Sequence, residues 1–540
     1  MTASAERSRP EEPFAPVWTS RRWLVCAALL WLGCTAVYFV TAPGRIDIID
    51  GAIRYNVTES MIELGMPVVP NPMYTAVRGP DGQRYAFYQI GASAAAVPFV
   101  LLGRRLGHGS LESKQFAFSL TAVPFAGAIV ALLFLIYGRM GLSLRQALNW
   151  SLVVAFCTLL WPYAGSTFDA VLQAFWLTLA MWAAIEALAG RSYRWACVSA
   201  AAFATLINVQ EMYLVLGVSV LAGVPVTYGT VWNRLKLPTV QVIIAGLIAG
   251  LLLVFLYNAL RFGNAIDTGR TSVPHPLVGN PLVGFAGLFI SPAKSVFLYS
   301  PTFLLALFGL RRLLARAPDR FAPVAACLLI HVALISSLKF WAGEWAWGPR
   351  YLVATLPLAC IGLPYAWPRG DRRRVTALLC GAGFMVQVLA ISVDHQRYYV
   401  DHSFSPFFWL DESVMYKHSP LLERPSELVA VLEGSDTHGV RALVPGPRFQ
   451  SMTSSIFGPP LELLQFFAKK DGTPATAPAW MRDYMVFLVP RPWPLWSGFI
   501  PEALRPGATG VMTLGGCLVA MASFAALAGL VRSVERRTGD

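Results

Sequence analysis

The chain has little charge and no cysteine arrangement suited to a metal or a disulfide framework. Charged residues make up 14% of its 540 residues, whereas soluble domains contain about 25%. All eight cysteines lie in apolar runs, and no two have a CxxC-type spacing. The sequence also has no repeat of fixed period and no low-complexity tract. Because 56% of the residues are hydrophobic, we expect an all-α polytopic membrane protein.

A small-residue cleavage site is likewise missing after the first apolar run, so we expect this run to be retained as a helix. Spanning helices need roughly 20 apolar residues. This criterion gives about 12 candidate spans, at 23–41, 116–138, 146–163, 168–189, 195–209, 212–229, 239–260, 295–310, 321–338, 351–367, 375–393 and 508–531. The apolar stretch 90–103 is shorter and contains Pro98. We therefore expect it to be a juxtamembrane or re-entrant helix.

The basic residues predict the orientation of the chain in the membrane. A net charge of +13 is compatible with nucleic-acid binding, but in a membrane protein it more often reflects Arg-rich cytoplasmic loops. With 90–103 left out of the spans, the basic clusters all lie on one side. They are Arg7/Arg9/Arg21/Arg22, Arg139/Arg145, Arg191/Arg194, Arg234/Lys236, Arg311/Arg312/Arg316/Arg320, Arg369/Arg372/Arg373/Arg374 and Arg532/Arg536/Arg537. We expect both termini in the cytoplasm and no nucleic-acid partner.

This orientation divides the chain into four parts. We expect a cytoplasmic tail at 1–22, a transmembrane domain at 23–393, an outer-face subdomain at 394–507, and a last span with its tail at 508–540. The third part is too long for a loop without structure of its own. The outer loop 42–115 begins with a predicted amphipathic helix at 51–64, whose Glu59 and Glu63 are expected to face water.

Ionisable residues at the outer ends of spans are candidates for function. Asp47 and Asp50 follow the first span, Asp169 precedes a long apolar helix, and Arg350 ends the loop 339–350. Each also has a simpler interpretation. Asp50 can be a solvated loop acid, Asp169 a helix N-cap, and Arg350 a snorkelling interfacial arginine. Further polar candidates on the outer loops are Lys294, Lys339, Glu344 and His395.

These residue types fit glycosyl transfer from a lipid-linked donor. A polyprenyl-phosphate sugar places an anionic phosphate at the membrane surface, where Arg or Lys can bind it and stabilise it as the leaving group. The attacking hydroxyl of the acceptor needs a carboxylate to take its proton. An inverting reaction needs one such base and no covalent intermediate. The spacing alone leaves Asp50 and Asp47 both open as the base.

Four stretches of the chain resemble the GT-C membrane glycosyltransferases, in particular bacterial lipid A aminoarabinose transferases and protein O-mannosyltransferases. The stretches are 50–65, DGQRYAFYQIGASAAAVPFVLLG at 81–103, LLWPYAGSTFDAVLQA at 159–174, and the motifs YNALRFGNAIDTG, SPAKSVFLYSP and WAGEWAWGPRYLVATLPL between 257 and 358. The resemblance covers roughly 20–400. The chain departs from it at Gln89–Ile90, where the family segment has a Pro pair.

The resemblance implies a GT-C-like bundle in a bacterial inner membrane, with an active site that faces the periplasm. It implies a polyprenyl-phosphate sugar donor and a lipid, glycan or protein acceptor. Asp50 would be the base, Asp169 a second acid, and Arg350 with a lysine the phosphate-side groups. The matching stretches add Arg54, Tyr55, Tyr85, Tyr88 and Gln89 as substrate-binding candidates. Enzymes of this kind differ in metal dependence, so a divalent metal stays open as a cofactor.

Three other functions remain as alternatives. A transporter or flippase for lipid-linked glycans predicts charges in the middle of spans and related sequence halves, and the sequence has neither feature. A scaffold with an outer binding module leaves the polar residues on several outer loops unexplained. A ligase or polymerase of lipid-linked glycans would use similar chemistry at the same face.

Overall fold

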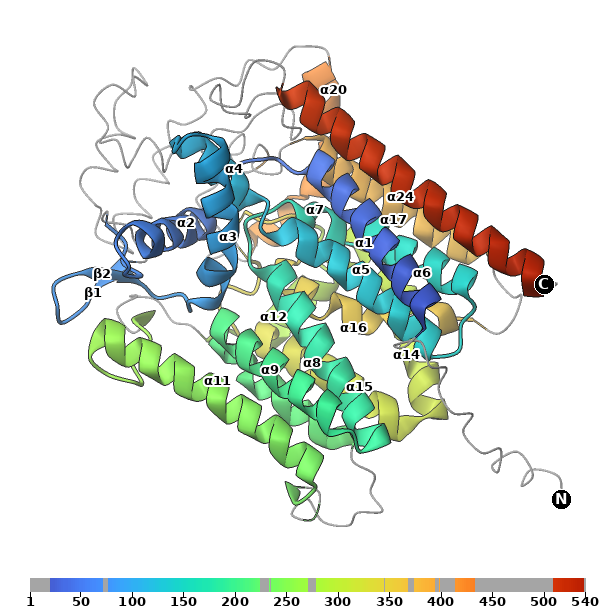
Figure 1. The fold of residues 1–540 in the computed structure, drawn as a ribbon, viewed down its shortest axis with the longest axis horizontal. Coiled ribbons are helices and arrows are strands. Elements are labelled where there is room, and N and C mark those ends of the chain that lie inside the picture. Colours follow the sequence, from blue (N-terminus) through green and yellow to red (C-terminus); the bar gives the residue numbers. More distant parts are fainter. Residues whose placement is uncertain are drawn as a thin grey trace.

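The computed structural model describes residues 20–70, 76–223, 233, 235–270, 278–343, 345–367, 373–393, 398, 413–432 and 508–538. Helices dominate these residues, and one two-stranded antiparallel hairpin pairs β1 with β2 (Figure 1). The first half of the chain contains α1 (Arg21–Thr41), α2 (Ile49–Glu63), β1 (Ala76–Arg78), β2 (Arg84–Ala86), α3 (Gly91–Leu106), α4 (Leu111–Ser119), α5 (Ala122–Arg139), α6 (Leu144–Phe156), α7 (Leu160–Ala164), α8 (Ala170–Gly190), α9 (Tyr193–Val209), the 3-10 helix η2 (Glu211–Gly223) and α11 (Pro238–Phe262).

The second half contains shorter and more interrupted helices. They are α12 (Pro281–Phe289), α13 (Val296–Tyr299), α14 (Thr302–Arg316), α15 (Pro318–Ser336), η5 (Arg350–Ala354), α16 (Leu356–Cys360), η6 (Leu363–Tyr365), α17 (Arg373–Ser392), α19 (Val414–Lys417), α20 (Pro420–Leu432) and α24 (Ala508–Thr538). Residues 433–507 lie outside the described residues. The predicted outer-face subdomain at 394–507 therefore stays a prediction over most of its length.

Seven helical segments of the described residues are long and apolar enough to cross a membrane, which makes this a multi-pass membrane fold. They are Arg21–Thr41, Ser113–Arg139, Ala170–Gly190, Pro238–Phe262, Pro318–Ser336, Arg373–Ser392 and Met512–Val534. Of the other five predicted spans, four are shorter or broken, and 212–229 lies partly outside the described residues. The run 146–163 divides into α6 and α7, and the run 351–367 divides into η5, α16 and η6. Apolar composition marked these segments, but it could not show where each helix breaks.

Small residues allow the long helices to pack closely. A side chain at Gly246 of α11 would meet the backbone of Ala200 in α9 at 2.5 Å, and one at Gly250 would meet Ala204 at 2.8 Å. This close approach of backbones is the usual packing mode of membrane helices. α9 also packs on α8, and α1 lies between α5 and α24. The result is a helical bundle that leaves α8 largely buried.

Helices α2, α3 and α4 gather at one end of the bundle, which we call the site end (Figure 1). The helix predicted at 51–64 is confirmed as α2. The prediction that its two glutamates face water is confirmed for Glu63, whose side chain is 40% exposed, and is wrong for Glu59, which is half-buried. Glu59 pairs with Lys114 of α4, and Glu63 pairs with Arg104 of α3 at 2.9 Å. The segment predicted as a juxtamembrane helix is α3, which packs against α4 and α2.

Candidate active site

Two carboxylates and two guanidinium groups from separate parts of the chain meet at the site end. Asp50 and Arg54 lie on the first turns of α2, Asp169 directly precedes α8, and Arg350 begins η5. Arg54 Nη2 lies 2.8 Å from Asp169 Oδ2, and Arg350 Nη1 lies 3.6 Å from Asp50 Oδ2. Because the α2 helix places Asp50 and Arg54 one turn apart, it brings the two ion pairs into one cluster.

Asp50 is buried and has polar partners on two sides. Only 5% of the residue is exposed. The hydroxyl of Tyr88 donates a hydrogen bond to Asp50 Oδ1, while Arg350 faces Oδ2. The backbone of Tyr88 is itself fixed, because Arg261 Nη1 at the end of α11 donates to the Tyr88 carbonyl at 2.9 Å. A carboxylate held between a hydroxyl donor and a guanidinium is well oriented to accept a further proton.

Arg54 is the most enclosed charge of the cluster. Its guanidinium bonds to Asp169 and lies over the Tyr88 ring, with 4.6 Å between Cζ and the ring centroid. Burial lowers the pKa of Arg54, but Asp169 and then Asp50 raise it, and the net shift is upward. Arg54 is therefore cationic. Its Nε and Nη1 atoms are buried without a hydrogen-bond partner among the described residues, which leaves donors for a bound anion.

Asp169 occupies the N-cap position of α8 but does not cap it. Its side chain makes no cap hydrogen bond within the described part of the chain, and it turns to Arg54 instead. The simpler interpretation of Asp169 as a helix cap is thus wrong. The snorkelling interpretation of Arg350 is also wrong, because 6% of that residue is exposed and its guanidinium lies 4.3 Å from the Phe168 ring centroid. Both residues belong to the buried cluster.

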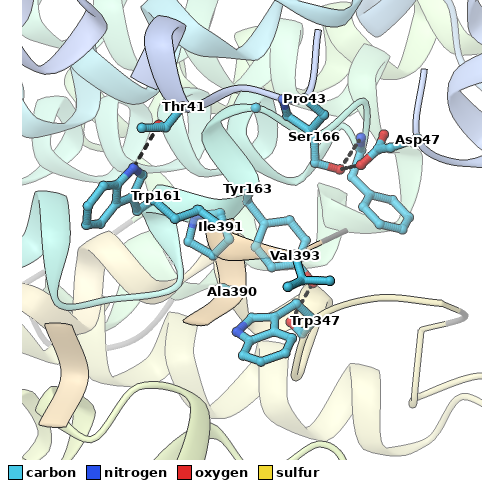
Figure 2. Close-up of a pocket in the computed structure, with 13 residues that line it drawn as sticks. Thr41, Pro43, Asp47, Trp161, Tyr163, Ser166, Trp347, Ala390, Ile391 and Val393 are labelled. Carbon is cyan, nitrogen blue, oxygen red and sulfur yellow. Dashed lines mark hydrogen bonds between the residues drawn. The ribbon is translucent and has the colours of Figure 1, made fainter. Parts of the chain in front are cut away.

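Asp47, the other candidate base, holds a turn of the backbone. Ser166 Oγ donates to its Oδ2 at 2.7 Å, and the Thr167 N–H donates to its Oδ1 at 2.8 Å. The Thr167 hydroxyl adds a third hydrogen bond to Oδ1. Figure 2 shows Asp47 and Ser166 joined in this way. Three hydrogen bonds to one turn are typical of a structural carboxylate.

The turn 166–168 separates two cavities. One lies beside Asp47 and is lined mainly by Trp161, Tyr163, Phe168, Trp347 and the end of α17 (Figure 2). The other lies under the ion pair on the opposite side of the turn. Its walls come from α2, α3, α4, α5 and α8, and its polar lining is Arg54, Ser119, Thr121, Ser166, Thr167 and Asp169. The cavity beside Asp47 is thus mostly aromatic and apolar, and the other cavity is lined by the Arg54–Asp169 ion pair.

The remaining tyrosine candidates and Gln89 each have different surroundings. Tyr85 donates to Asp81 within the β-hairpin at 2.6 Å, and burial together with that carboxylate raises the pKa of Tyr85 to about 12. Tyr55 is buried edge-on against Phe118. Gln89 follows Tyr88 and is 2% exposed, and its amide has no hydrogen-bond partner among the described residues.

The lysine candidates are placed in loops of the second half. Lys294 is fully buried and its Nζ donates to the Ala346 carbonyl at 2.7 Å, so it fastens the loop that leads to Arg350. Lys339 is half-buried beside the backbone bridge between Val278 and Leu338. Glu344 and His395 lie outside the described residues.

Two residues of this region escaped the sequence-based candidates. Phe168 carries Arg350 on its ring, and Arg350 Nη2 donates to the Tyr351 hydroxyl at 2.8 Å. Their positions directly before Asp169 and after Arg350 were the available signal. Among the described residues, no three His, Cys, Asp or Glu side chains lie close enough to hold a metal ion. The cluster is therefore built from alternating charges rather than from converging acids.

Comparison with known proteins finds similarity in structure but not in sequence. No protein-family model and no curated protein matches the chain. A crystal structure of ArnT from Cupriavidus metallidurans bound to undecaprenyl phosphate is similar over 91% of this chain and 77% of that one, with 15% identity and a TM-score of 0.45. The apo structure of the same protein is similar over 86% and 75%, with 14% identity and a TM-score of 0.43.

Proposed function

We propose that this chain is an inverting membrane glycosyltransferase. It moves a sugar from a polyprenyl-phosphate-linked donor to a hydroxyl acceptor at the periplasmic face of a bacterial inner membrane. The observation that carries the proposal is the buried cluster of two carboxylates and two guanidinium groups, in which the Arg54–Asp169 and Arg350–Asp50 pairs lie together. Burying charges is costly unless they are paired or serve a ligand.

The guanidinium groups supply what a phosphate leaving group needs. When the bond between the anomeric carbon and the phosphate oxygen breaks, the electron pair goes to that oxygen, and a cation beside it lowers the barrier. Arg54 has two buried donor atoms without a partner among the described residues. Arg350 is held by Phe168 and Tyr351 with its guanidinium toward Asp50. We assign the donor phosphate to the space between these two arginines.

Asp50 is the better base of the two candidates. The acceptor hydroxyl loses its proton to a carboxylate as its oxygen attacks the anomeric carbon. Both oxygens of Asp47 already accept hydrogen bonds from Ser166 or Thr167. Asp50 accepts a hydrogen bond from the Tyr88 hydroxyl and lies next to both arginines. A proton moved to Asp50 stays in the cluster that holds the phosphate.

The apolar cavity fits the lipid part of such a donor. Its walls are aromatic, and they reach from Asp47 to Ala390, Ile391 and Val393 at the end of α17, a helix that is exposed along much of its length. Trp161, a wall of the cavity, contacts Phe384, which is 42% exposed on the same helix. The first isoprene units would lie in this cavity. The phosphate would lie past the turn 166–168, next to Arg54 and Arg350.

The test is donor consumption by the purified full chain in proteoliposomes, with a panel of radiolabelled polyprenyl-phosphate sugars and a mixture of lipid and glycan acceptors. We expect one donor to be consumed with release of polyprenyl phosphate. A flippase or transporter would move the donor across the bilayer and leave it intact. Intact donor in every member of the panel, with the protein folded, would contradict the proposal.

A further inference from the structure

A chain of buried polar side chains crosses the bundle next to the charged cluster. The Tyr213 hydroxyl of η2 donates to Gln173 Oε1 of α8 at 3.1 Å. His331 Nε2 of α15 lies 3.2 Å from the same hydroxyl, and His331 Nδ1 lies 2.9 Å from the Thr355 hydroxyl, at the end of η5. Each of the four residues is at most 5% exposed. Four elements that are distant in sequence are thus joined by three hydrogen bonds.

The donors and acceptors assign one direction to this chain. A tyrosine hydroxyl has one proton, and Tyr213 gives its proton to Gln173, so it accepts from His331 Nε2–H. A neutral imidazole then has Nδ1 free to accept. We assign the single Thr355 hydroxyl proton to Nδ1 at 2.9 Å, because the Leu352 carbonyl, the other acceptor, lies farther away at 3.4 Å. This assignment satisfies every member with the Nε2–H tautomer of His331, and a fully satisfied buried network is rigid.

Both ends of the chain are attached to the charged cluster. Gln173 lies one turn after Asp169 on α8, and its N–H donates to the Asp169 carbonyl at 2.9 Å. Thr355 directly follows η5, the short helix that starts at Arg350. η5 packs on α8. The network therefore ties the element that carries Arg350 to the helix that carries Asp169, through a histidine that lies outside the cluster.

Apolar side chains could fill this space as well as polar ones. Buried polar groups are costly when unsatisfied and add little net stability when satisfied, whereas they fix the register of the elements that they join. η5 is a short 3-10 helix of five residues between the loop 345–349 and Thr355. A short helix of this kind needs an external anchor to hold a side chain in one position.

We propose that Tyr213, His331 and Thr355 are positioning residues that fix Arg350 against the Asp169 end of α8. The inference rests on the proposed function, because it assigns to the network the alignment of the donor-phosphate site. None of the three touches the donor. They act on it through the placement of η5.

The test uses substitutions that keep shape and remove one hydroxyl. Tyr213→Phe breaks the network, and its matched control is Tyr137→Phe, since Tyr137 is equally buried but donates at 2.7 Å to the Cys360 carbonyl. Thr355→Val is matched by Thr178→Val, since Thr178 bonds only within its own helix. We expect polyprenyl phosphate to bind Tyr213→Phe about tenfold more weakly, an effect of the size of one lost buried hydrogen bond, and the control as tightly as the parent.

The double variant separates a network from two independent contacts. If the residues act as one unit, Tyr213→Phe with Thr355→Val weakens binding by about the same tenfold as either alone, instead of about a hundredfold. Equal binding by Tyr213→Phe and Tyr137→Phe would overturn the inference. So would additive losses.

Hydrogen exchange gives a readout that does not depend on the proposed function. We expect the amides of 350–355 to exchange faster in Tyr213→Phe than in Tyr137→Phe, even if no lipid phosphate binds. If the amides of 350–355 exchange equally fast in Tyr213→Phe and Tyr137→Phe, the network does not position η5 and the inference is overturned. Faster exchange together with a parent protein that neither binds nor consumes a polyprenyl-phosphate compound contradicts the proposed function and the alignment of a phosphate site, but leaves the mechanical link intact.

Discussion

An acid lies near each end of helix α8, half-buried Asp169 and buried Glu186, and the two acids are bound in different ways. At one end Asp169 pairs with Arg54 through one contact of 2.8 Å. Near the other end Glu186 pairs with Arg139 through two contacts, Nε–Oε1 at 2.9 Å and Nη2–Oε2 at 3.0 Å. The second arrangement is a closed bidentate fork, the geometry of strong structural pairs. In the Arg54–Asp169 pair, Arg54 Nε and Nη1 have no hydrogen-bond partner among the described residues. The Arg350–Asp50 pair lies beside it.

The two pairs also differ in what surrounds them, and the proposed function assigns a ligand only to the Arg54–Asp169 pair. Arg139 and Glu186 join the ends of α5 and α8. Arg54 and Asp169 line a cavity and lie beside Asp50 and Arg350. Distance and burial alone would not distinguish the two pairs. The predictions for Asp50→Asn and Asp169→Asn below use Glu186→Gln as their reference.

The largest difference is expected between Asp50→Asn and Glu186→Gln. Removing a general base lowers turnover by about 100-fold or more, while Glu186→Gln removes a charge far from the reaction. Turnover is measured with saturating donor at equal amounts of folded protein. A common loss in both variants would show that charge removal anywhere in the bundle inactivates the chain, and the contrast between the two ends would disappear.

Arg350→Gln is expected to have the next largest effect. The amide keeps some polarity but cannot balance the charge of a leaving phosphate, so kcat/KM falls by about 100-fold. Arg350→Lys recovers part of that loss, because it restores charge without the planar fork. A series of donor concentrations separates the effect on KM from that on kcat. Equal kcat/KM values for Arg350→Gln and the parent protein would mean that the donor phosphate does not bind at Arg350.

Asp169→Asn is expected to lower kcat/KM by about tenfold. It leaves Arg54 in place but removes the carboxylate that orients it, so binding weakens more than chemistry. Because one partner of a buried pair is removed in each case, Asp169→Asn and Glu186→Gln should both lose about 1–3 kcal/mol of stability. Thermal unfolding in detergent measures this loss of stability. Activity lost in parallel with stability in both variants would refute a special role for the site end.

The smallest effect is expected for Tyr85→Phe. Tyr85 bonds to Asp81 inside the β-hairpin, and its hydroxyl takes no part in the cluster. Its raised pKa of about 12 keeps it protonated throughout the neutral range. Turnover is therefore expected within about twofold of the parent protein, as for other substitutions outside the site. A tenfold loss would require the hairpin to contact the donor or the acceptor.

The sequence predicted the helical membrane fold and the segments that meet at the site, because both depend on composition and on the placement of charges relative to apolar runs. The α2 helix, the short α3 helix and the shared location of Asp50, Asp169 and Arg350 follow from those patterns. Helix breaks within 146–163 and 351–367 could not be predicted, because apolar residues in a bundle interior permit several backbone paths.

The choice between the two candidate bases needed the structure. Asp47 and Asp50 are three residues apart in a polar loop, and nothing local distinguishes them. The distinction comes from Ser166 and Thr167, which are distant in sequence and bind Asp47. The partial burial of Glu59 was missed for the same reason, since its partner Lys114 lies on another helix. Contacts between residues that are distant in sequence cannot be deduced from the spacing of residues within one segment.

The most direct test is the ratio of donor turnover between Asp47→Asn and Asp50→Asn, measured side by side with the same donor and equal folded protein. Asp47→Asn keeps the shape of the side chain that binds the turn 166–168, and we expect it to retain at least a third of the parent turnover. Asp50→Asn loses about 100-fold, so the ratio should be well above 10. A ratio near one, or an inverted one, would contradict the assignment of Asp50 as the base.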